Sequence, residues 1–310
     1  MAEYVENISI WETDLLRKRD GRLWKSPGPK QLALPTDYLQ HSIFTSWDQS
    51  TDGITWTRGA QGIVVSPPDV YLTPRDALLL GTLGQRWLED GGSEDDRVVR
   101  MSLNECARAM GYQASGGKAR RDAAAALRRL TTATLTLDRR GVDTTGKPVT
   151  DRCDWHILDC NYTRIADDGG TSVRLSLETA AFLGAGYFTY LVAPIARDIA
   201  NADEKACRLW LLLESEALTN GFTYRLLRDP AAPRQKPGQK RGQKYVAEVL
   251  GISHWGNPRQ IKARIVKAIK VIEQQDHGRY GLRLETNRAG VTFLNAVRTS
   301  RKALPRRLDE

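Results

Sequence analysis

One order of predicted elements (helix, strand, helix, turn, helix, strand pair) occurs twice along the 310-residue sequence. This repetition predicts an α+β fold of two tandem winged-helix domains with an N-terminal strand/loop extension. A short sequence similarity marks the same place in both copies, because Ala107–Gly111 matches Ala247–Gly251 at the end of a predicted helix. We therefore predict an extension over residues 1–66, a first winged-helix domain over 67–190 and a second over 191–310.

The predicted extension has weak periodicity and several turn signals, such as Ser26–Pro29 and Thr51–Gly53. Short β-like segments lie among them at Ile54–Thr57 and Gly62–Val65. We expect this region to pack on the first domain as strands and loops.

Capping signals define the first domain. Thr73 and Pro74 start a helix, and Ser102 with Glu105 forms the capping box of another. The predicted elements are helices over about 73–90, 102–110 and 118–130 and strands over 97–101, 134–138 and 155–162. The last two strands would form the wing, joined by the polar segment 139–152.

The second domain repeats this order. Its predicted elements are helices over about 194–218, 245–250 and 257–275 and strands over 222–227, 280–285 and 291–297. Residues 229–243 contain three prolines and four Lys or Arg, which indicates a flexible basic loop.

The composition is that of a globular protein, with 41% hydrophobic and 27% charged residues. Apolar runs such as Leu78–Leu80 are too short for a membrane span, and the acidic N-terminus does not resemble a signal peptide. The four cysteines form no paired CxxC motif, which favours free thiols in a reducing compartment. We expect a cytoplasmic protein with no membrane partner.

Basic residues are concentrated towards the C-terminus. Residues 225–310 carry 20 Lys and Arg against 7 Asp and Glu, whereas the preceding residues carry 26 against 30. A solubilising surface or attraction to anionic lipid would explain the excess, but its placement on particular elements favours a polyanionic partner. Two basic segments, the loop containing Arg234–Lys244 and the tail containing Arg298–Arg307, are further candidates for phosphate contact.

The helix predicted from residue 257 has two opposite faces. At 100° per residue, Ile261, Ile265 and Ile269 lie on one side, and cationic residues without an acid before Glu273 lie on the other. A solvated face would normally mix charge signs. Arg and Gln near a helix start can contact base edges in the major groove. The predicted DNA-binding residues here are Asn257, Arg259, Gln260, Lys262, Arg264, Lys267 and Lys270.

The matching helix of the first domain, over 118–130, has a weaker cationic face. Its predicted DNA-binding residues are Lys118, Arg120, Arg121 and Arg128. The Ala124–Ala125 pair would let a backbone approach the groove, although it also reflects simple helix propensity. A face used mainly for dimerisation or regulation is the alternative.

Enzyme signatures are weak throughout the sequence. Gly111–Ala119 superficially resembles a phosphate-binding loop, but its spacing is one residue too long and Ala119 replaces the Ser or Thr that would bind Mg²⁺. The four histidines form no His-x-His pair, and Cys153, His156 and Cys160 are more typical of a buried wing than of a metal site. We predict no catalytic residues, no metal and no cofactor.

The segments Leu72–Leu80 and Ser102–Leu130, together with the second helix–turn–helix before a C-terminal hairpin, resemble the plasmid replication initiators that bind repeated origin sequences (iterons) through tandem winged helices. The resemblance covers roughly residues 72–298 and rests on pattern more than on a diagnostic motif; residues up to 66 do not match it. It implies that the C-terminal winged helix makes the main base contacts, through Arg259, Gln260, Lys262 and Arg264.

The same resemblance implies the partners. They are double-stranded DNA with origin repeats, a second copy of the chain in a homodimer that represses its own gene, and host replication proteins such as an initiator or a replicative helicase. A winged-helix transcriptional regulator without a replication role is the main alternative, and a chromosome-organising or phage structural protein also stays open.

Overall fold

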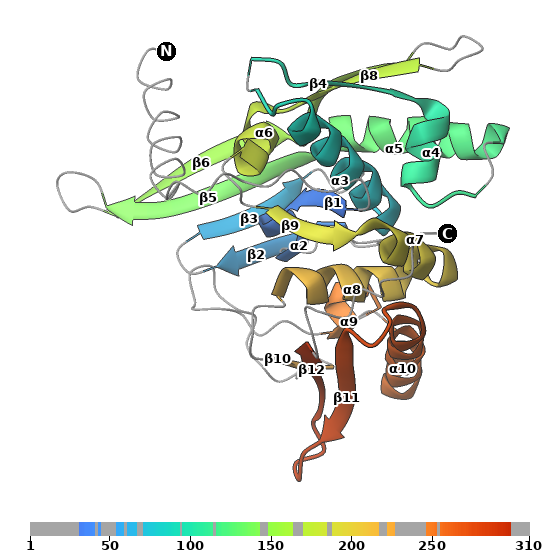
Figure 1. The fold of residues 1–310 in the computed structure, drawn as a ribbon. Coiled ribbons are helices and arrows are strands. Elements are labelled where there is room, and N and C mark those ends of the chain that lie inside the picture. The colour runs from blue at the N-terminus through green and yellow to red at the C-terminus, as the bar shows by residue number, and fades with distance from the viewer. Residues whose placement is uncertain are drawn as a thin grey trace.

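The computed structural model describes residues 31–40, 43–44, 54–58, 61–66, 71–93, 95–113, 116–142, 148–163, 170–184, 188–216, 222–226, 246–252 and 255–298 (Figure 1). Helices and small sheets alternate along these residues, and each strand pair among them is antiparallel. The fold is therefore of mixed α and β type, as the sequence predicts.

The first helix–turn–helix unit begins at α3 (Pro74–Glu89), where Thr73 and Asp76 form a reciprocal capping box. It continues with β4 (Val98–Ser102), α4 (Leu103–Ala109) and α5 (Gly117–Thr132). Two later strands, β7 (Leu158–Thr163) and β8 (Gly170–Leu175), complete a three-stranded sheet in the order β4-β8-β7.

The second unit repeats this arrangement. It consists of α8 (Glu204–Glu216), β10 (Phe222–Arg225), α9 (Val246–Val249), α10 (Pro258–Gln275), β11 (Tyr280–Thr286) and β12 (Thr292–Arg298). Its sheet has the order β10-β12-β11, so in both units the strand after the first helix pairs with the last strand of the hairpin. Figure 1 shows the β11–β12 hairpin projecting from the lower end of the molecule.

The remaining elements join N-terminal strands to later parts of the chain. Strand β1 (Gln31–Pro35), followed by α2 (Thr36–Gln40), pairs with β9 (Phe188–Val192). Strands β2 (Ile54–Arg58), β3 (Gln61–Ser66), β5 (Thr134–Val142) and β6 (Pro148–His156) form a sheet in that order. Helices α6 (Leu177–Gly184) and α7 (Ala193–Ala202) flank β9. The predicted boundary at residue 66 is therefore bridged by two strand pairs, and the one at 190 falls inside β9.

Two predictions about elements are wrong in detail. The single helix predicted over 194–218 is two helices, because Asp203 adopts an extended backbone (φ −163°, ψ 114°) between α7 and α8. The predicted wing pair of 134–138 with 155–162 is also revised. Residues 134–142 pair with 148–156, whereas 158–163 pair with 170–175, so residues 139–142 and 148–152 of the polar segment belong to paired strands.

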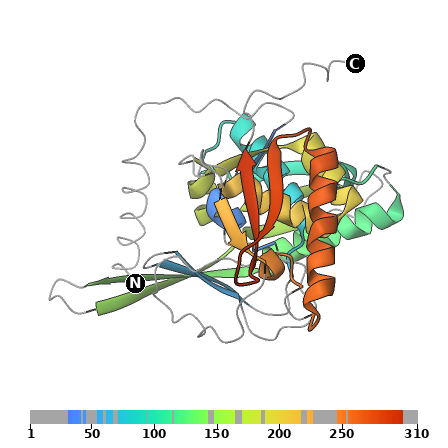
Figure 2. The ribbon, with the colours of Figure 1, turned by 90° about the horizontal axis from the view of Figure 1, so that it is seen from below.

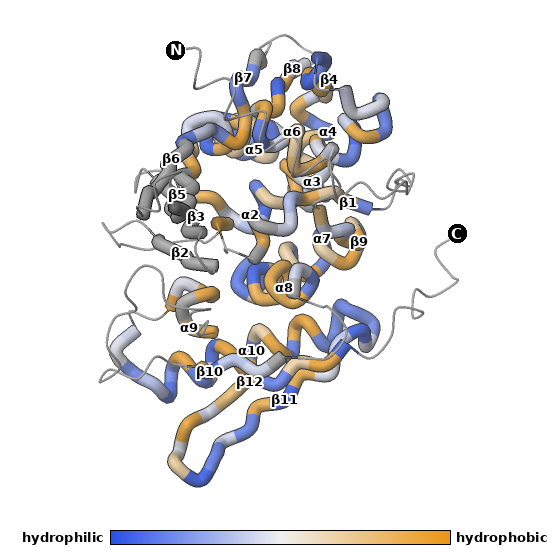
Figure 3. The backbone as a smooth tube through the Cα atoms, turned by 90° about the vertical axis from the view of Figure 1, so that its left-hand side faces the viewer, coloured by the Kyte–Doolittle hydropathy of each residue, from blue (hydrophilic) through white to orange (hydrophobic). Residues whose placement is uncertain are grey.

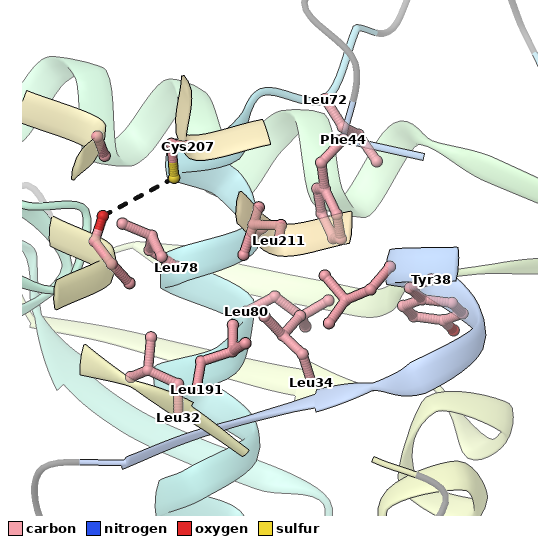
Figure 4. Packing of buried hydrophobic residues seen from close by; sticks show 14 of the residues in the cluster. Leu32, Leu34, Tyr38, Phe44, Leu72, Leu78, Leu80, Leu191, Cys207 and Leu211 are labelled. Atoms are coloured by element: carbon pink, nitrogen blue, oxygen red, sulfur yellow. Dashed lines mark hydrogen bonds between the residues drawn. The ribbon is translucent and has the colours of Figure 1, made fainter. Parts of the chain in front are cut away.

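The core lies where α3, α8, β1 and β9 meet. Figure 4 shows Leu78 and Leu80 of α3, Leu34 of β1 and Leu211 of α8 among the buried hydrophobic side chains of this cluster. All four side chains are at most 3% exposed. The elements that carry the two helix–turn–helix units are thus held together by one continuous hydrophobic cluster.

Figure 3 shows hydrophobic and hydrophilic residues interspersed along α10 and its neighbours. Among the described residues, no helix is long and apolar enough to cross a membrane.

A Leu80→Ala substitution tests this core. Leu80 is 1% exposed, so truncation should leave a cavity and lower the free energy of unfolding by about 2–5 kcal/mol. Thermal or urea unfolding followed by circular dichroism measures the loss. Lys267→Ala, at an exposed helix position, is the control and should change stability by no more than about 0.5 kcal/mol. Equal effects of the two substitutions would contradict the packing described.

Candidate nucleic-acid interface

Helix α10 begins at a well-formed cap. The Asn257 side chain accepts a hydrogen bond from the backbone N–H of Arg259 at 3.0 Å, and Pro258 occupies the first helical position. The helix then buries a single stripe of residues against the domain, namely Ile261, Ile265, Ala268, Ile269 and Ile272. These are the residues predicted for its core face, and their burial leaves the opposite face free.

The free face of α10 is cationic. Arg259, Lys262, Lys267 and Lys270 are exposed, as are Asn257 and Gln260. The one acidic residue of α10, Glu273, lies in its last turn. Such a face attracts a polyanion, because each phosphate that it neutralises releases a counterion.

Arg264 differs from the other predicted residues of this helix. Its guanidinium donates two hydrogen bonds of 2.6 Å to the two carboxylate oxygens of Asp203, and its side chain is 19% exposed. Burial of Asp203 opposes ionisation, but the bonds from Arg264 and from backbone N–H groups lower the pKa of this carboxyl below its usual value. In the structure Arg264 therefore supports α10 through Asp203 and is less exposed than the other cationic residues of this helix.

Helix α5 has a comparable but smaller cationic face. Lys118, Arg121 and Arg128 are exposed, with the small Ala125 between them, and Arg120 is half-buried. Asp122, the acidic residue of α5, accepts a hydrogen bond from the Tyr112 hydroxyl at 2.8 Å. The structure thus keeps all four predicted residues of α5 on or beside one surface.

The neighbouring Arg129 is tied to the helix behind. Its Nε and Nη2 atoms donate to the two carboxylate oxygens of Asp76 at 2.9 and 2.7 Å. Burial raises the pKa of Asp76, although Arg129 opposes that shift. Sequence spacing gives no sign of this pair, since the partners are 53 residues apart.

The turns before α5 and α10 share one backbone conformation. Gly111 (φ 92°) and Gly251 (φ 63°) both adopt the left-handed region, which a side chain would disfavour. The same backbone hydrogen bond closes both helix ends, from Tyr112 N–H to Ala107 C=O (3.1 Å) and from Ile252 N–H to Ala247 C=O (2.9 Å). The sequence similarity between residues 107–111 and 247–251 therefore corresponds to a repeated helix end.

Basic side chains fix both turns from behind. Arg75 donates to the Met110 carbonyl at 2.7 Å, and Arg208 donates to the Val249 carbonyl at 3.1 Å. These carbonyls lie at the C-terminal ends of α4 and α9, where unpaired C=O groups favour cations.

The β11–β12 hairpin adds basic residues that the sequence analysis did not select. Arg283 and Arg288 are exposed, and Arg288 lies in the turn that Asn287 closes by accepting the N–H of Ala289 and Val291. The Asn287–Arg288 dipeptide between two predicted strands indicates a hairpin turn, and it is the sequence feature that could have identified Arg288 as an exposed basic residue. By contrast, Arg298 lies 3.5 Å from the Glu214 carboxylate inside the domain. The loop 229–243 and residues 301–307 of the tail lie outside the described residues.

The two cationic helices lie on the same side of the molecule. Figures 1 and 2 both show α10 at the right-hand side, and α5 extends towards that side in both views. Among the described residues no group of three or more His, Cys, Asp or Glu is arranged to hold a metal ion.

The fold is similar to that of a known structure. A crystal structure of domains 2 and 3 of RctB matches this chain with a TM-score of 0.56 and 9% sequence identity, over 86% of this chain and 99% of the other. No family profile matches the sequence, and no curated protein matches it significantly. At this identity the similarity establishes a shared fold over most of the chain.

The role of Asn257 is open to a direct test. Asn257→Ala removes the cap of α10 and should lower the free energy of unfolding by about 0.5–2 kcal/mol, whereas Asn257→Ser should retain most of the stability. Chemical denaturation of the three proteins gives the comparison. A DNA affinity that falls in the serine variant while its stability is preserved would show that Asn257 also contacts DNA.

Proposed function

We propose that the protein is a sequence-specific double-stranded DNA-binding protein built from two winged-helix domains. The observation that carries the proposal is the exposed face of α10, with four cationic side chains and no acid before the last turn. The matching order of the sheets β4-β8-β7 and β10-β12-β11 supports the assignment of both units to this class. Binding without catalysis is part of the proposal.

We further propose that the bound sites are repeated sequences (iterons) at a plasmid origin and that binding initiates DNA replication. The similarity in fold to domains 2 and 3 of RctB, a replication initiator, supports this role. In this proposal a homodimer represses the protein's own gene and the origin-bound form recruits host replication proteins. A plasmid that carries the gene and its flanking DNA, and no other origin of replication, should replicate in a host cell. Regulation of a promoter without replication would instead indicate a transcriptional regulator.

Removal of two cations from α10 should abolish specific binding. Arg259→Ala combined with Lys262→Ala leaves the buried isoleucine stripe untouched, so the fold should persist while affinity for a selected site falls by at least about tenfold. Gel-shift titration of duplexes enriched from a random pool measures this loss. Arg174→Ala, at an exposed position of β8 outside both helices, serves as the control. Unchanged affinity of the double variant would refute the assignment of α10.

Binding should weaken steeply with salt, since several phosphates would be neutralised. A plot of log K against log salt concentration should have a slope of about −0.9 for each phosphate contacted. The Lys267→Ala variant should reduce the magnitude of that slope by about one contact, because Lys267 is exposed and has no role in the core. A flat plot for the unmodified protein would exclude the interface described.

A further inference from the structure

Each cationic helix is fixed to the helix behind it by an Asp–Arg pair. On α10, Arg264 donates two hydrogen bonds of 2.6 Å to Asp203. On α5, Arg129 donates bonds of 2.9 and 2.7 Å to Asp76. Both pairs are bidentate, which is the strongest and most directional geometry available to a guanidinium and a carboxylate.

Both aspartates are themselves held by the start of a helix. Asp203 accepts hydrogen bonds from the backbone N–H groups of Lys205 and Ala206 at 2.9 and 3.1 Å, in the first turn of α8. Asp76 accepts the N–H of Thr73 at 2.7 Å in the capping box of α3. Each carboxylate is therefore fixed in position, with relative exposures of 8% for Asp203 and 0% for Asp76.

The arginines lie between the two faces of their helices. At 100° per residue, Arg264 is about 140° from Arg259, at the border between the buried stripe and the exposed cationic stripe. Arg129 is likewise half-buried, next to the exposed Arg128. A bond at this border resists rotation of the helix about its own axis.

Apolar packing supplies less of that resistance than a directional bond does. The buried faces of α5 and α10 consist of alanine, leucine and isoleucine side chains, whose attraction to the core is non-directional. A small rotation would keep most of the buried area but would move every exposed side chain relative to a DNA groove. Contacts to base edges depend on such alignment, whereas attraction to phosphates depends mainly on charge.

We propose that Asp203–Arg264 and Asp76–Arg129 are positioning pairs that set the rotation of α10 and α5 and thereby determine sequence discrimination. The inference rests on the proposed function, because it assigns these residues to DNA recognition without contact to DNA. The inference predicts that variants of these pairs lose sequence specificity while they keep non-specific affinity, whereas variants that remove charge from the exposed face should lose both.

The experiment compares Arg264→Lys, Asp203→Asn and the double variant with the unmodified protein. Arg264→Lys conserves the charge but removes the bidentate bond, and Asp203→Asn retains an oxygen that can cap α8. The affinity for a duplex enriched from a random pool and for a scrambled duplex is measured over a range of salt concentrations. Arg174→Lys, an exposed arginine of β8, is the matched control. Arg129→Lys and Asp76→Asn repeat the test in the first unit.

Both single variants should lower the ratio of specific to non-specific affinity by about tenfold or more, as expected when a base contact is misaligned. The affinity ratio of the double variant should fall about as much as that of the more affected single variant, because both changes remove the same interaction. Affinity for the scrambled duplex and the salt slope should stay within about twofold of the unmodified protein. Thermal melting measured in parallel keeps the binding assays below the unfolding transition.

Other outcomes would overturn the inference. A ratio preserved in Arg264→Lys, with only the melting temperature lowered, would make the pair purely structural. A ratio lost in Arg264→Lys but preserved in Asp203→Asn would mean that Arg264 contacts DNA itself. If the unmodified protein enriches no sequence from the random pool, the proposed function fails, and this inference fails with it. That outcome is distinguishable from the two above, because in both of those the unmodified protein still forms a specific complex.

Discussion

The packing of α8 is the constraint on which both halves of the structure depend. Residues 206–215 of this helix are all buried, so it has no solvated face. It packs against α2, α3 and β9 of the N-terminal part and against α9 and α10 of the second unit. A helix that is apolar on all sides is buried, so the elements around α8 share it as a common packing partner. The break at Asp203 adds a further connection, because it supplies the extended residue whose carboxylate caps α8 and binds Arg264.

The two buried charges of α8 connect it to the second unit in a different way from its apolar residues. Burial lowers the pKa of Arg208 to about 9, and the side chain donates to the Val249 carbonyl. Its Nε and Nη2 atoms have no hydrogen-bond partner among the described residues, so part of the cost of burial is not offset. At the other end, Glu214 accepts a hydrogen bond from Arg279 at 3.0 Å, and burial raises the pKa of its carboxyl. Separation of the second unit from α8 would leave charges without partners in addition to exposing apolar surface, which disfavours independent movement of the two.

Sequence reasoning succeeded where the determinants are local. The caps at Thr73 and Ser102 and the buried stripe of α10 follow from residues within one or two turns of each other, and the structure reproduces them. Longer-range determinants were missed. Apolar residues continue with helical spacing across Asp203, so periodicity could not reveal the break. Strand β5 also pairs with β3, which precedes it by more than 60 residues, and no local pattern marks so distant a partner. Local patterning likewise could not reveal that Arg264 is paired inside the protein, because its partner Asp203 is 61 residues away.

The same supporting chemistry holds the two cationic helices to different degrees. On α10 the exposed cations between Arg259 and Lys270 lie within six residues of Arg264, on both sides of it. On α5 the exposed Lys118 is eleven residues from Arg129, a distance of about 16 Å along a helix. Between these two positions, α5 is held by the hydrogen bond from the Tyr112 hydroxyl to the Asp122 carboxylate. Positional error grows with distance from a fixed point, and base contacts tolerate less of it than phosphate contacts do. Within the proposed function, the support of the exposed cations is therefore closer on α10 than at the start of α5, and we expect α10 to make the larger contribution to sequence discrimination.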